Sequence, residues 1–361
     1  MTNPLVTIAI PSYNHAKYIG ETIQSALDQT FQDFEILIVD DSSTDNTLEI
    51  IKKFTDSRIR LIVSEKNQGV CQTSNICIQN ALGKYIALIA SDDIMEKTKL
   101  EKQINFLEQN SNYGAVFSGM EVIDENGVTN KKKTTKYTKI FEKENRSRFE
   151  WLKYFFHHGN CIAAPSLLAK TSALKETGNF NKSITQAHDL DFWVRLCLQG
   201  YEIYIIHEKL LKYRERNNNG NLSSNTKDTR IRLLFDNEKV LKNFLKISSL
   251  NDFIKIFPDS SGASLQFFSQ QEEQIIIDYL IFKEAYKNSP NHYHTQFAIS
   301  LLYETLQKDG AEEILNKNFG FDFKEYKKII TQNPLGVLLE KCNEPFSKKI
   351  LKSFFRNLKN L

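Results

Sequence analysis

Two adjacent acidic residues, Asp92 and Asp93, follow an apolar segment at residues 84–89. Neighbouring carboxylates at the exit of a buried strand repel each other, and a cation bound beside them relieves that cost. Carboxylate oxygens suit Mg²⁺ or Mn²⁺, especially an ion that substrate phosphates also hold. The alternative is a structural role, in which the pair forms a turn or caps the helix that follows. The pair alone does not decide between a metal site and a turn.

A second acidic pair, Asp40 and Asp41, follows the apolar segment 35–39, and Tyr13 follows the first apolar segment of the chain. One side chain among residues 43–45 is expected to cap the next helix, but a cap needs only one group and leaves the acidic pair unexplained. A carboxylate at this place can accept a hydrogen bond from a nucleobase N–H or a ribose hydroxyl. A tyrosine ring beside it can stack on a flat base.

Short apolar, β-rich segments alternate with amphipathic helical patterns up to about residue 120. Near-continuous apolar strands separated by helices indicate a parallel sheet covered on both faces. Ligands of such sheets gather at the C-terminal ends of the strands, where Tyr13, Asp41 and Asp93 stand. Strands are expected at about residues 5–10, 35–39, 58–63, 84–89 and 115–118, and helices at about 19–27, 45–54, 72–81 and 100–107.

The later sequence divides into three parts. Residues 124–148 are polar and rich in lysine, which predicts a long mobile excursion. An Asn/Gly/Ser-rich linker at 217–225 precedes a sequence that is helical almost throughout, so we expect an α/β domain over residues 1–225 and an α-helical region over 226–361. Between the excursion and the linker, helices are expected at about 147–156 and 190–198, and strands at about 202–206 and 209–213.

Composition narrows the class of protein. The chain has 361 residues, 41% of them apolar and 25% charged, with a formal net charge of +3. These values are typical of a soluble globular protein and give no argument for a nucleic-acid partner. The sequence has no apolar run long enough to span a membrane and no basic segment before its first apolar stretch, which predicts a cytosolic chain. The scattered cysteines fit small buried apolar residues better than a disulfide framework.

Two common nucleotide-binding motifs are missing. The first strand is followed by PSYN at residues 11–14 and not by GxGxxG, which argues against a dinucleotide-binding fold. GxxxxGK[ST] occurs nowhere, which argues against a P-loop. Any nucleotide must therefore be held by other means than a glycine-rich phosphate loop.

Recognisable motifs occur, in this order, at 11–14 (PSYN), 25–31 (SALDQTF), 38–45 (IVDDSSTD), 67–69 (NQG), 83–93 (GKYIALIASDD), 178–180 (GNF) and 188–195 (HDLDFWVR). These motifs and their order resemble the family 2 glycosyltransferases over about residues 4–225. The resemblance implies a GT-A fold, in which a Rossmann-like, mostly parallel sheet is flanked by helices. It also implies a nucleotide-sugar donor and inversion at the anomeric carbon.

This resemblance assigns a role to each matching position. Tyr13 and Asp41 match the positions that stack on and hydrogen-bond the uracil of a UDP-sugar, and Pro11 and Asn14 belong to the same donor-binding loop. Asp92 matches a position near the ribose and the sugar, and Asp93 matches the carboxylate that binds Mn²⁺ or Mg²⁺ on the donor diphosphate. Asp189 matches the catalytic base, and Arg216 stands where a phosphate-binding histidine is usual.

Several positions depart from the family pattern. Ala90 replaces the first Asp of the metal motif, Ser74 replaces an Arg, and His188 replaces the Glu before the base. Asp189 also has a structural alternative as the N-cap of the helix at 190–198, and Asp191 is a competing candidate that could simply complement the helix dipole. The departures support a rival interpretation, a catalytically inactive scaffold that retains the nucleotide pocket. A nucleotidyltransferase is a further rival, although it usually has a glycine-rich loop after its first strand.

The resemblance and the charge pattern together suggest an acceptor and a location. The expected acceptor is a glycan or a lipid-linked saccharide of a bacterial surface polysaccharide. Residues 346–361 carry Lys348, Lys349, Lys352, Arg356 and Lys359 without an acidic residue, and their apolar side chains recur at helical spacing. This segment is either an amphipathic helix on the inner face of an anionic membrane or a last helix packed on the protein.

Overall fold

The computed structural model describes residues 3–217, 220–260, 269–287 and 292–331. The chain forms two compact units, Met1–Asn243 and Phe244–Leu361. The sequence analysis places a boundary near Asn225, whereas these units divide after helix α9 (Lys227–Leu241), which contacts helix α8 (His188–Leu198).

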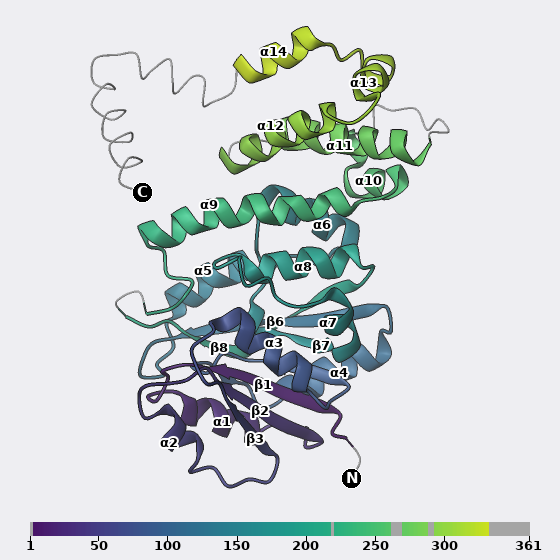
Figure 1. Ribbon diagram of the computed structural model, residues 1–361. Coiled ribbons are helices and arrows are strands. Elements are labelled where there is room, and N and C mark those ends of the chain that lie inside the picture. Colours follow the sequence, from purple (N-terminus) through teal and green to yellow (C-terminus); the bar gives the residue numbers. More distant parts are fainter. Residues whose placement is uncertain (1–2, 218–219, 261–268, 288–291, 332–361) are drawn as a thin grey trace, which may run out of the picture. The chain divides into compact units, whose positions relative to one another are not determined.

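The first unit is built on one eight-stranded sheet with the strand order β3-β2-β1-β4-β7-β6-β8-β5 (Figure 1). Strands β1 to β4 are mutually parallel, which confirms the expected α/β class. Strand β7 runs antiparallel to β4 and β6, and β5 runs antiparallel to β8, so the second half of the sheet is mixed. The strands are β1 (Val6–Ser12), β2 (Phe34–Asp40), β3 (Ile59–Val63), β4 (Tyr85–Leu88), β5 (Ile94–Met95), β6 (Tyr113–Ile123), β7 (Leu168–Lys170) and β8 (Glu202–Arg214).

The central strands are buried because helices cover both faces of the sheet. Ile8 and Ile36 share an apolar cluster with Ile23 of α1 and Leu100 of α4. Helix α3 contacts the same two strands, β1 and β2, from the opposite face (Figure 1). The helices of this part are α1 (Ile19–Leu27), α2 (Thr47–Ile51), α3 (Val70–Asn80) and α4 (Lys99–Gln109).

Two features of the first unit differ from the expectation. Strand β8 is continuous from Glu202 to Arg214, where two strands were expected. Its pairing with β6 is irregular near Gly119, where β8 has extra residues, and the strand continues past this irregularity. The predicted excursion at 124–148 contains helix α5 (Lys131–Phe141), whose N-cap Asn130 accepts a hydrogen bond from Lys133 N. Tyr137 and Phe141 of α5 pack against the core of the sheet, so this lysine-rich segment is anchored by one apolar face.

The remaining elements of the first unit position the far side of the site. A capping box between Ser147 and Glu150 fixes the start of α6, which contacts α8. Trp151 of α6 and Trp193 of α8 are both fully buried. The elements are α6 (Arg148–His158), the 3₁₀ turn Ala164–Ser166, α7 (Thr171–Thr177), α8 and α9.

The second unit is helical throughout its described residues, as the sequence analysis expects. Helix α11 packs against α12 and α13 around buried apolar side chains such as Ile276 and Leu280. Across the described residues, no helix is both long enough and apolar enough to cross a membrane. The predicted amphipathic helix at 346–361 lies outside the described residues. The helices are α10 (Leu250–Ile256), α11 (Gln270–Lys287), α12 (His292–Leu306), α13 (Ala311–Phe319) and α14 (Phe323–Thr331), with 3₁₀ turns at Lys242–Lys246 and Pro258–Ser260.

Candidate active site

The C-terminal ends of β1, β2 and β4 form one edge of the sheet. Strand β1 pairs with both β2 and β4, and Pro11 and Ser12 lie opposite Val39 and Asp40. The backbone N–H of Asp41 donates to the carbonyl of Ser12 over 2.8 Å. The loops that leave these strands therefore start side by side.

The loop after β1 is tied to the loop after β2 by Asn14. Its side-chain oxygen accepts a hydrogen bond from Thr44 N at 2.7 Å, and its backbone N–H donates to Ser43 Oγ at 2.9 Å. Asn14 has φ 52°, a conformation that asparagine tolerates better than most residues. Tyr13, the preceding residue, is 42% exposed, so its ring is free to stack on a ligand. Asn14 thus holds the loop that presents Tyr13.

The two acidic residues after β2 have different partners. Asp40 is fully buried and accepts hydrogen bonds from Ser43 N and Ser43 Oγ, so it closes the turn. The Asp41 carboxylate accepts the backbone N–H groups of Gln68 and Gly69, at 2.9 and 2.7 Å, and so holds the start of α3. A carboxylate has about four acceptor positions, so Asp41 keeps capacity for a ligand.

Asp93 is the most strongly perturbed carboxyl group at this edge. It is 1% exposed, and its Oδ1 accepts the backbone N–H of Arg214 at 2.8 Å. Burial, and after it the charge of Asp92, raises the pKa of Asp93 well above its usual value. Its other oxygen, Oδ2, is buried, and none of the described residues gives it a hydrogen-bond partner. An unpaired buried oxygen of this kind is costly unless a ligand or ion occupies it.

Arg214 fixes the turn that carries the two carboxylates. This fully buried residue donates through Nε to the carbonyl of Asp92 at 2.8 Å. Its Nη1 donates to the carbonyls of Asp124 and Glu125 at 3.1 and 3.2 Å, and its Nη2 pairs with Glu21. The sequence does not indicate Arg214 as a site residue, because its partners come from three distant segments that no local pattern connects.

Arg216 and His15 flank the carboxylate of Asp92. Arg216 Nε lies 3.1 Å from Asp92 Oδ2, and His15 Nε2 lies 3.9 Å from the same oxygen. His15 Nδ1 is within hydrogen-bond distance of Ser91 Oγ, at 2.7 Å. Burial lowers the pKa of His15, against the opposing effect of Asp92. Arg216 was expected at the donor site, whereas His15 was missed because its contacts depend on the β1 and β4 loops meeting.

The oxygen ligands at this edge fit a divalent ion whose remaining ligands come from the substrate. In the part of the chain that the structure describes, no group of three or more His, Cys, Asp or Glu side chains is arranged to hold a metal. Mg²⁺ and Mn²⁺ need few protein ligands when phosphates supply the others. The unpaired Oδ2 of Asp93 offers one hard oxygen ligand at the expected position.

Asp189 lies in the first turn of α8. The helix begins at His188 with Ala187 as its N-cap, so the interpretation of Asp189 as the N-cap is wrong. Its carboxylate accepts hydrogen bonds from Asn160 Nδ2 and from Leu190 N, both at 2.7 Å. Asp189 is half-buried, and burial raises its pKa, which makes the ionised form a stronger base.

Asp191, the competing candidate, is occupied by structural contacts. It is 3% exposed, and its carboxylate accepts hydrogen bonds from Arg195 Nε at 2.9 Å and from Asn243 Nδ2 at 2.8 Å. Arg195 also donates to the carbonyls of Thr177 and Asn179. The Asp191–Arg195 pair therefore joins α8 to the turn at 178–180 and leaves Asp189 as the carboxylate with fewer structural partners.

Helix α3 connects the Asp41 side of the site with Asp189. Its first turn follows Gly69, which Asp41 binds, and its Cys71 Sγ contacts the carbonyl of Ile184 at 3.7 Å. The pKa of the Cys71 thiol is raised to about 11, mainly by burial and next by the charge of Asp189. The Asp189 carboxylate is therefore close enough to the start of α3 to affect the ionisation of Cys71.

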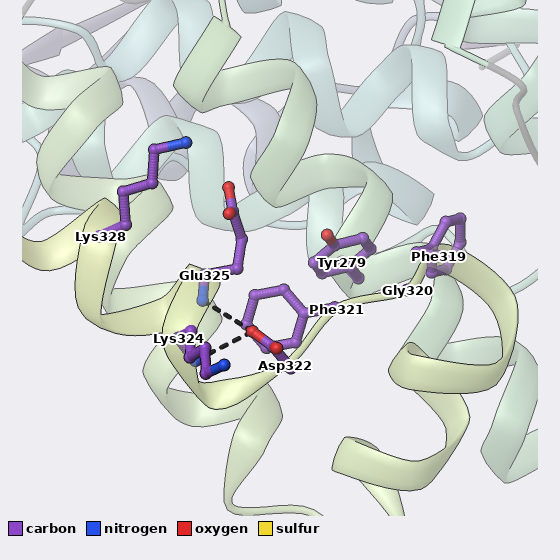
Figure 2. Close-up of a pocket in the computed structure, with 8 residues that line it drawn as sticks. All are labelled: Tyr279, Phe319, Gly320, Phe321, Asp322, Lys324, Glu325 and Lys328. Carbon is purple, nitrogen blue, oxygen red and sulfur yellow. Dashed lines mark hydrogen bonds between the residues drawn. The ribbon is translucent and has the colours of Figure 1, made fainter.

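A separate hollow lies in the second unit. It has a volume of about 500 Å³ and is floored by the rings of Tyr279, Phe319 and Phe321 (Figure 2). Asp322, at its edge, accepts the backbone N–H groups of Lys324 and Glu325. No residue that the sequence analysis assigned to the site lines this hollow.

Comparisons by sequence identify several related proteins. The family described as "Glycosyl transferase family 2" matches residues 7–170. An uncharacterized glycosyltransferase of Methanocaldococcus jannaschii is 35% identical over 228 residues, which cover 62% of this chain and 75% of that protein. The putative teichuronic acid biosynthesis glycosyltransferase TuaG of Bacillus subtilis is 32% identical over 62% of this chain and 84% of its own length. WfgD of Escherichia coli, described as a UDP-Glc:alpha-D-GlcNAc-diphosphoundecaprenol beta-1,3-glucosyltransferase, is 38% identical over 36% of this chain and 51% of its own length.

Comparisons by structure give the same fold. TarS 1–349 of S. aureus, also crystallised with UDP-GlcNAc, has a TM-score of 0.55 and 18% identity, covering 84% of this chain and 90% of that one. The mannosyltransferase PcManGT of Pyrobaculum calidifontis, in complex with GDP-Man and Mn²⁺, has a TM-score of 0.53 and 16% identity, covering 92% and 83%. At these identities the likeness establishes the architecture, which is the expected GT-A type.

Proposed function

We propose that this chain, which belongs to glycosyltransferase family 2, transfers a sugar from a UDP-sugar to a hydroxyl of a glycan or lipid-linked saccharide. The transfer would depend on Mn²⁺ or Mg²⁺ and invert the anomeric centre. The observation that carries the proposal is the buried, unpaired Oδ2 of Asp93 at the edge where the β1, β2 and β4 loops meet. The names of TuaG and WfgD support a role in bacterial surface polysaccharide synthesis. The proposed location is the cytoplasmic face of the membrane.

The donor would bind across the loops after β1, β2 and β4. The exposed ring of Tyr13 would stack on the uracil beside Pro11, in the loop that Asn14 holds, and Asp41 would accept a hydrogen bond from the base. Asp92 would accept hydrogen bonds from ribose or sugar hydroxyls. Arg216 would leave its ion pair with Asp92 to bind the diphosphate, since a guanidinium matches phosphate oxygens well.

The site must above all stabilise the negative charge that develops on the leaving group during the reaction. A divalent ion bound at Asp93 would act as a Lewis acid that stabilises the negative charge on the departing diphosphate. Arg214 holds the Asp92–Asp93 turn by two hydrogen bonds and occupies Asp93 Oδ1, so Oδ2 would be the oxygen that binds the ion. The buried setting of Asp93 strengthens this electrostatic interaction.

Asp189 would act as the general base. Its hydrogen bond from Asn160 orients the carboxylate, and its raised pKa lies nearer to the working pH than that of an ordinary aspartate. The acceptor hydroxyl would lose its proton to Asp189 while its oxygen attacks the anomeric carbon and the sugar–phosphate bond breaks. A single displacement without a covalent enzyme intermediate inverts the configuration.

The alternative is a catalytically inactive scaffold that retains the nucleotide pocket. Ala90, Ser74 and His188, which depart from the family pattern, favour it. The enzyme and the scaffold would both bind UDP, so binding does not separate them. Donor turnover that is lost in Asp189→Asn while UDP binding persists would contradict the scaffold.

The direct test is a thermal-shift screen of UDP-glucose, UDP-GlcNAc, UDP-galactose and GDP-mannose, each with and without Mn²⁺. A ligand that binds only the folded state raises the melting temperature according to its affinity. We expect a UDP-sugar to raise it more with Mn²⁺ than without. A larger shift with GDP-mannose would contradict the proposed UDP donor, and no shift with any donor would contradict the proposed function.

A further inference from the structure

Helix α9 exposes a strip of large apolar side chains. Ile231, Leu234 and Phe235 are 43%, 47% and 66% exposed. Their spacing of three and four residues places them on one face of the helix. Helix α9 runs alongside α8 in the first unit (Figure 1). At about 100° per residue, the buried Asp236 lies on the face of α9 opposite the strip, and the face that carries the strip is called the outer face. An exposed, contiguous apolar surface of this kind marks an interaction site.

Cationic side chains flank this strip along both edges. At about 100° per residue, Arg230 lies on one side of the strip, and Arg232 and Lys239 lie on the other. All three are exposed, and Lys227 is exposed one turn earlier. The acidic groups of the helix surface are the exposed Asp228 and the half-buried Glu238, which lies 3.9 Å from Lys242. The face is therefore apolar from Ile231 to Phe235, and the charged side chains around it are more often positive than negative.

The opposite face of α9 is hydrogen-bonded to the segment that precedes the helix of the candidate base. Asp236 is buried, and its Oδ2 accepts the backbone N–H groups of Gln186 and Ala187, at 2.5 and 3.2 Å. These two residues directly precede α8, which carries Asp189. Two hydrogen bonds therefore connect α9 to the start of the helix that carries Asp189.

A further exposed apolar side chain lies in the loop that precedes α9. Leu222, 51% exposed, belongs to the segment between Arg216 and α9. Its carbonyl accepts Gln186 Nε2 at 2.9 Å, and the neighbouring Asn221 accepts Arg216 N at 2.7 Å. The loop that carries Leu222 is therefore tied both to the segment before α8 and to Arg216.

We infer that the outer face of α9, with Leu222, docks on an anionic membrane surface. The apolar strip would enter the boundary between headgroups and acyl chains, and Arg230, Arg232 and Lys239 would reach the lipid phosphates. A second copy of the chain fits less well, because α9 packed against α9 would bring like charges together. Docking here would place Asp189 beside the bilayer, where a lipid-linked acceptor presents its saccharide; this purpose rests on the proposed function, whereas the docking itself does not.

Vesicle flotation of the full chain tests the inference. The probes are vesicles of phosphatidylglycerol with phosphatidylethanolamine and, for comparison, of phosphatidylcholine alone. The variants are Arg230→Gln with Arg232→Gln, and Ile231→Ser with Phe235→Ser. The matched controls are Lys52→Gln with Lys53→Gln, which removes two exposed charges elsewhere, and Leu82→Ser, which removes an apolar side chain that is 48% exposed at the far edge of the sheet.

We expect the wild type to float with the anionic vesicles and to bind neutral ones weakly. Removing two cations should weaken the partition coefficient by about 30-fold, and removing the two apolar side chains by at least about tenfold. The control variants should bind as the wild type does. UDP binding should be unchanged in every variant, so a failure of the proposed function, seen as absent UDP binding, is distinguishable from a failure of the docking.

Four outcomes would overturn the inference. Equal flotation of the wild type and the α9 variants would show that another surface, or none, binds lipid. A comparable loss in the controls would make the effect non-specific. A dimeric wild type that becomes monomeric with Phe235→Ser would assign the face to a second copy. A melting temperature that falls by several degrees with Ile231→Ser and Phe235→Ser would show that this chain itself covers the strip.

Discussion

Arg214 binds both members of the acidic pair that precedes β5, donating its backbone N–H to Asp93 Oδ1 and its Nε to the carbonyl of Asp92, each at 2.8 Å. The contact joins the end of β8 to the turn after β4, which lies 122 residues earlier in the sequence. It orients Asp93 without using its second oxygen, which is the group available for an ion. Arg214 is in this sense a positioning residue for the proposed metal site.

Replacing Arg214 with lysine should destabilise the first unit. Lysine keeps the charge but cannot reach three separate carbonyls and Glu21 from one planar group, and it leaves buried acceptors unpaired. We expect a loss of about 3 kcal/mol in the free energy of unfolding, measured by urea denaturation. Arg216→Lys is the matched control and should change stability by less than about 1 kcal/mol, since Arg216 is partly exposed. Similar losses for both variants would contradict the positioning role.

The pKa of Asp93 predicts a pH dependence of stability. Because its folded-state pKa lies well above 3.8, the folded protein retains a proton at a pH where the unfolded chain has released it. The contribution of Asp93 to the free energy of unfolding should therefore fall as the pH rises above about 3.8. Asp93→Asn removes this ionisation and keeps an acceptor for Arg214 N. The variant should gain stability over the wild type toward neutral pH in the absence of divalent ions; a constant difference between pH 4 and 8 would contradict a raised pKa.

Replacing Asp189 with asparagine should remove catalysis and leave donor binding intact. A positioned base contributes about 10² to 10⁴ in rate, so kcat for sugar transfer should fall within or beyond this range. In the wild type, kcat/KM should fall as the pH decreases through the pKa of Asp189, and this acidic limb should lie above 3.8. A variant with near wild-type kcat would exclude Asp189 as the base.

Asp191→Asn should give the opposite pattern. It breaks a buried ion pair with Arg195 and weakens the contact with Asn243, so the free energy of unfolding should fall by about 3 kcal/mol. Activity per folded molecule should stay within about tenfold of the wild type at a temperature below the transition. Loss of kcat without loss of stability would instead assign the base to Asp191.

Tyr13→Ala should weaken UDP binding without changing stability. The ring is 42% exposed, so its removal leaves no cavity, whereas stacking of a base on an aromatic ring contributes about 1–3 kcal/mol. We expect the Kd for UDP to rise by about tenfold or more, by isothermal titration calorimetry. Tyr13→Phe retains the stacking surface and should bind almost as the wild type does. An equal loss in both variants would indicate a role for the hydroxyl rather than for the ring.

Much of the fold could be predicted from the sequence because its signals are local. Apolar strands and amphipathic helices alternate, and the sheet then brings Tyr13, Asp41 and Asp93 to one edge by topology alone. Helix α5 was not expected, because its many lysines make the segment polar and only two aromatic residues anchor it to the core. The continuity of β8 was also missed, since pairing with β6 is decided by long-range hydrogen bonds and an irregular ladder.

The candidate site was less predictable in its supporting contacts. Arg214 and His15 contact the acidic pair only because segments distant in the sequence meet, and no local pattern signals such meetings. The alternative role of Asp189 as an N-cap is excluded, since the helix begins two residues earlier than expected, at His188. Such shifts of one or two residues are common at helix ends, and here the shift decides whether Asp189 closes the helix or faces a ligand.

If Asp93 Oδ2 holds a divalent ion on the donor diphosphate, calorimetric titration of UDP into the wild type and Asp93→Asn, each with and without Mn²⁺, should show it. Mn²⁺ should tighten UDP binding to the wild type by at least tenfold and leave the affinity of the folded Asp93→Asn variant unchanged. Equal Mn²⁺ enhancement in both proteins, or none in the wild type, would contradict it.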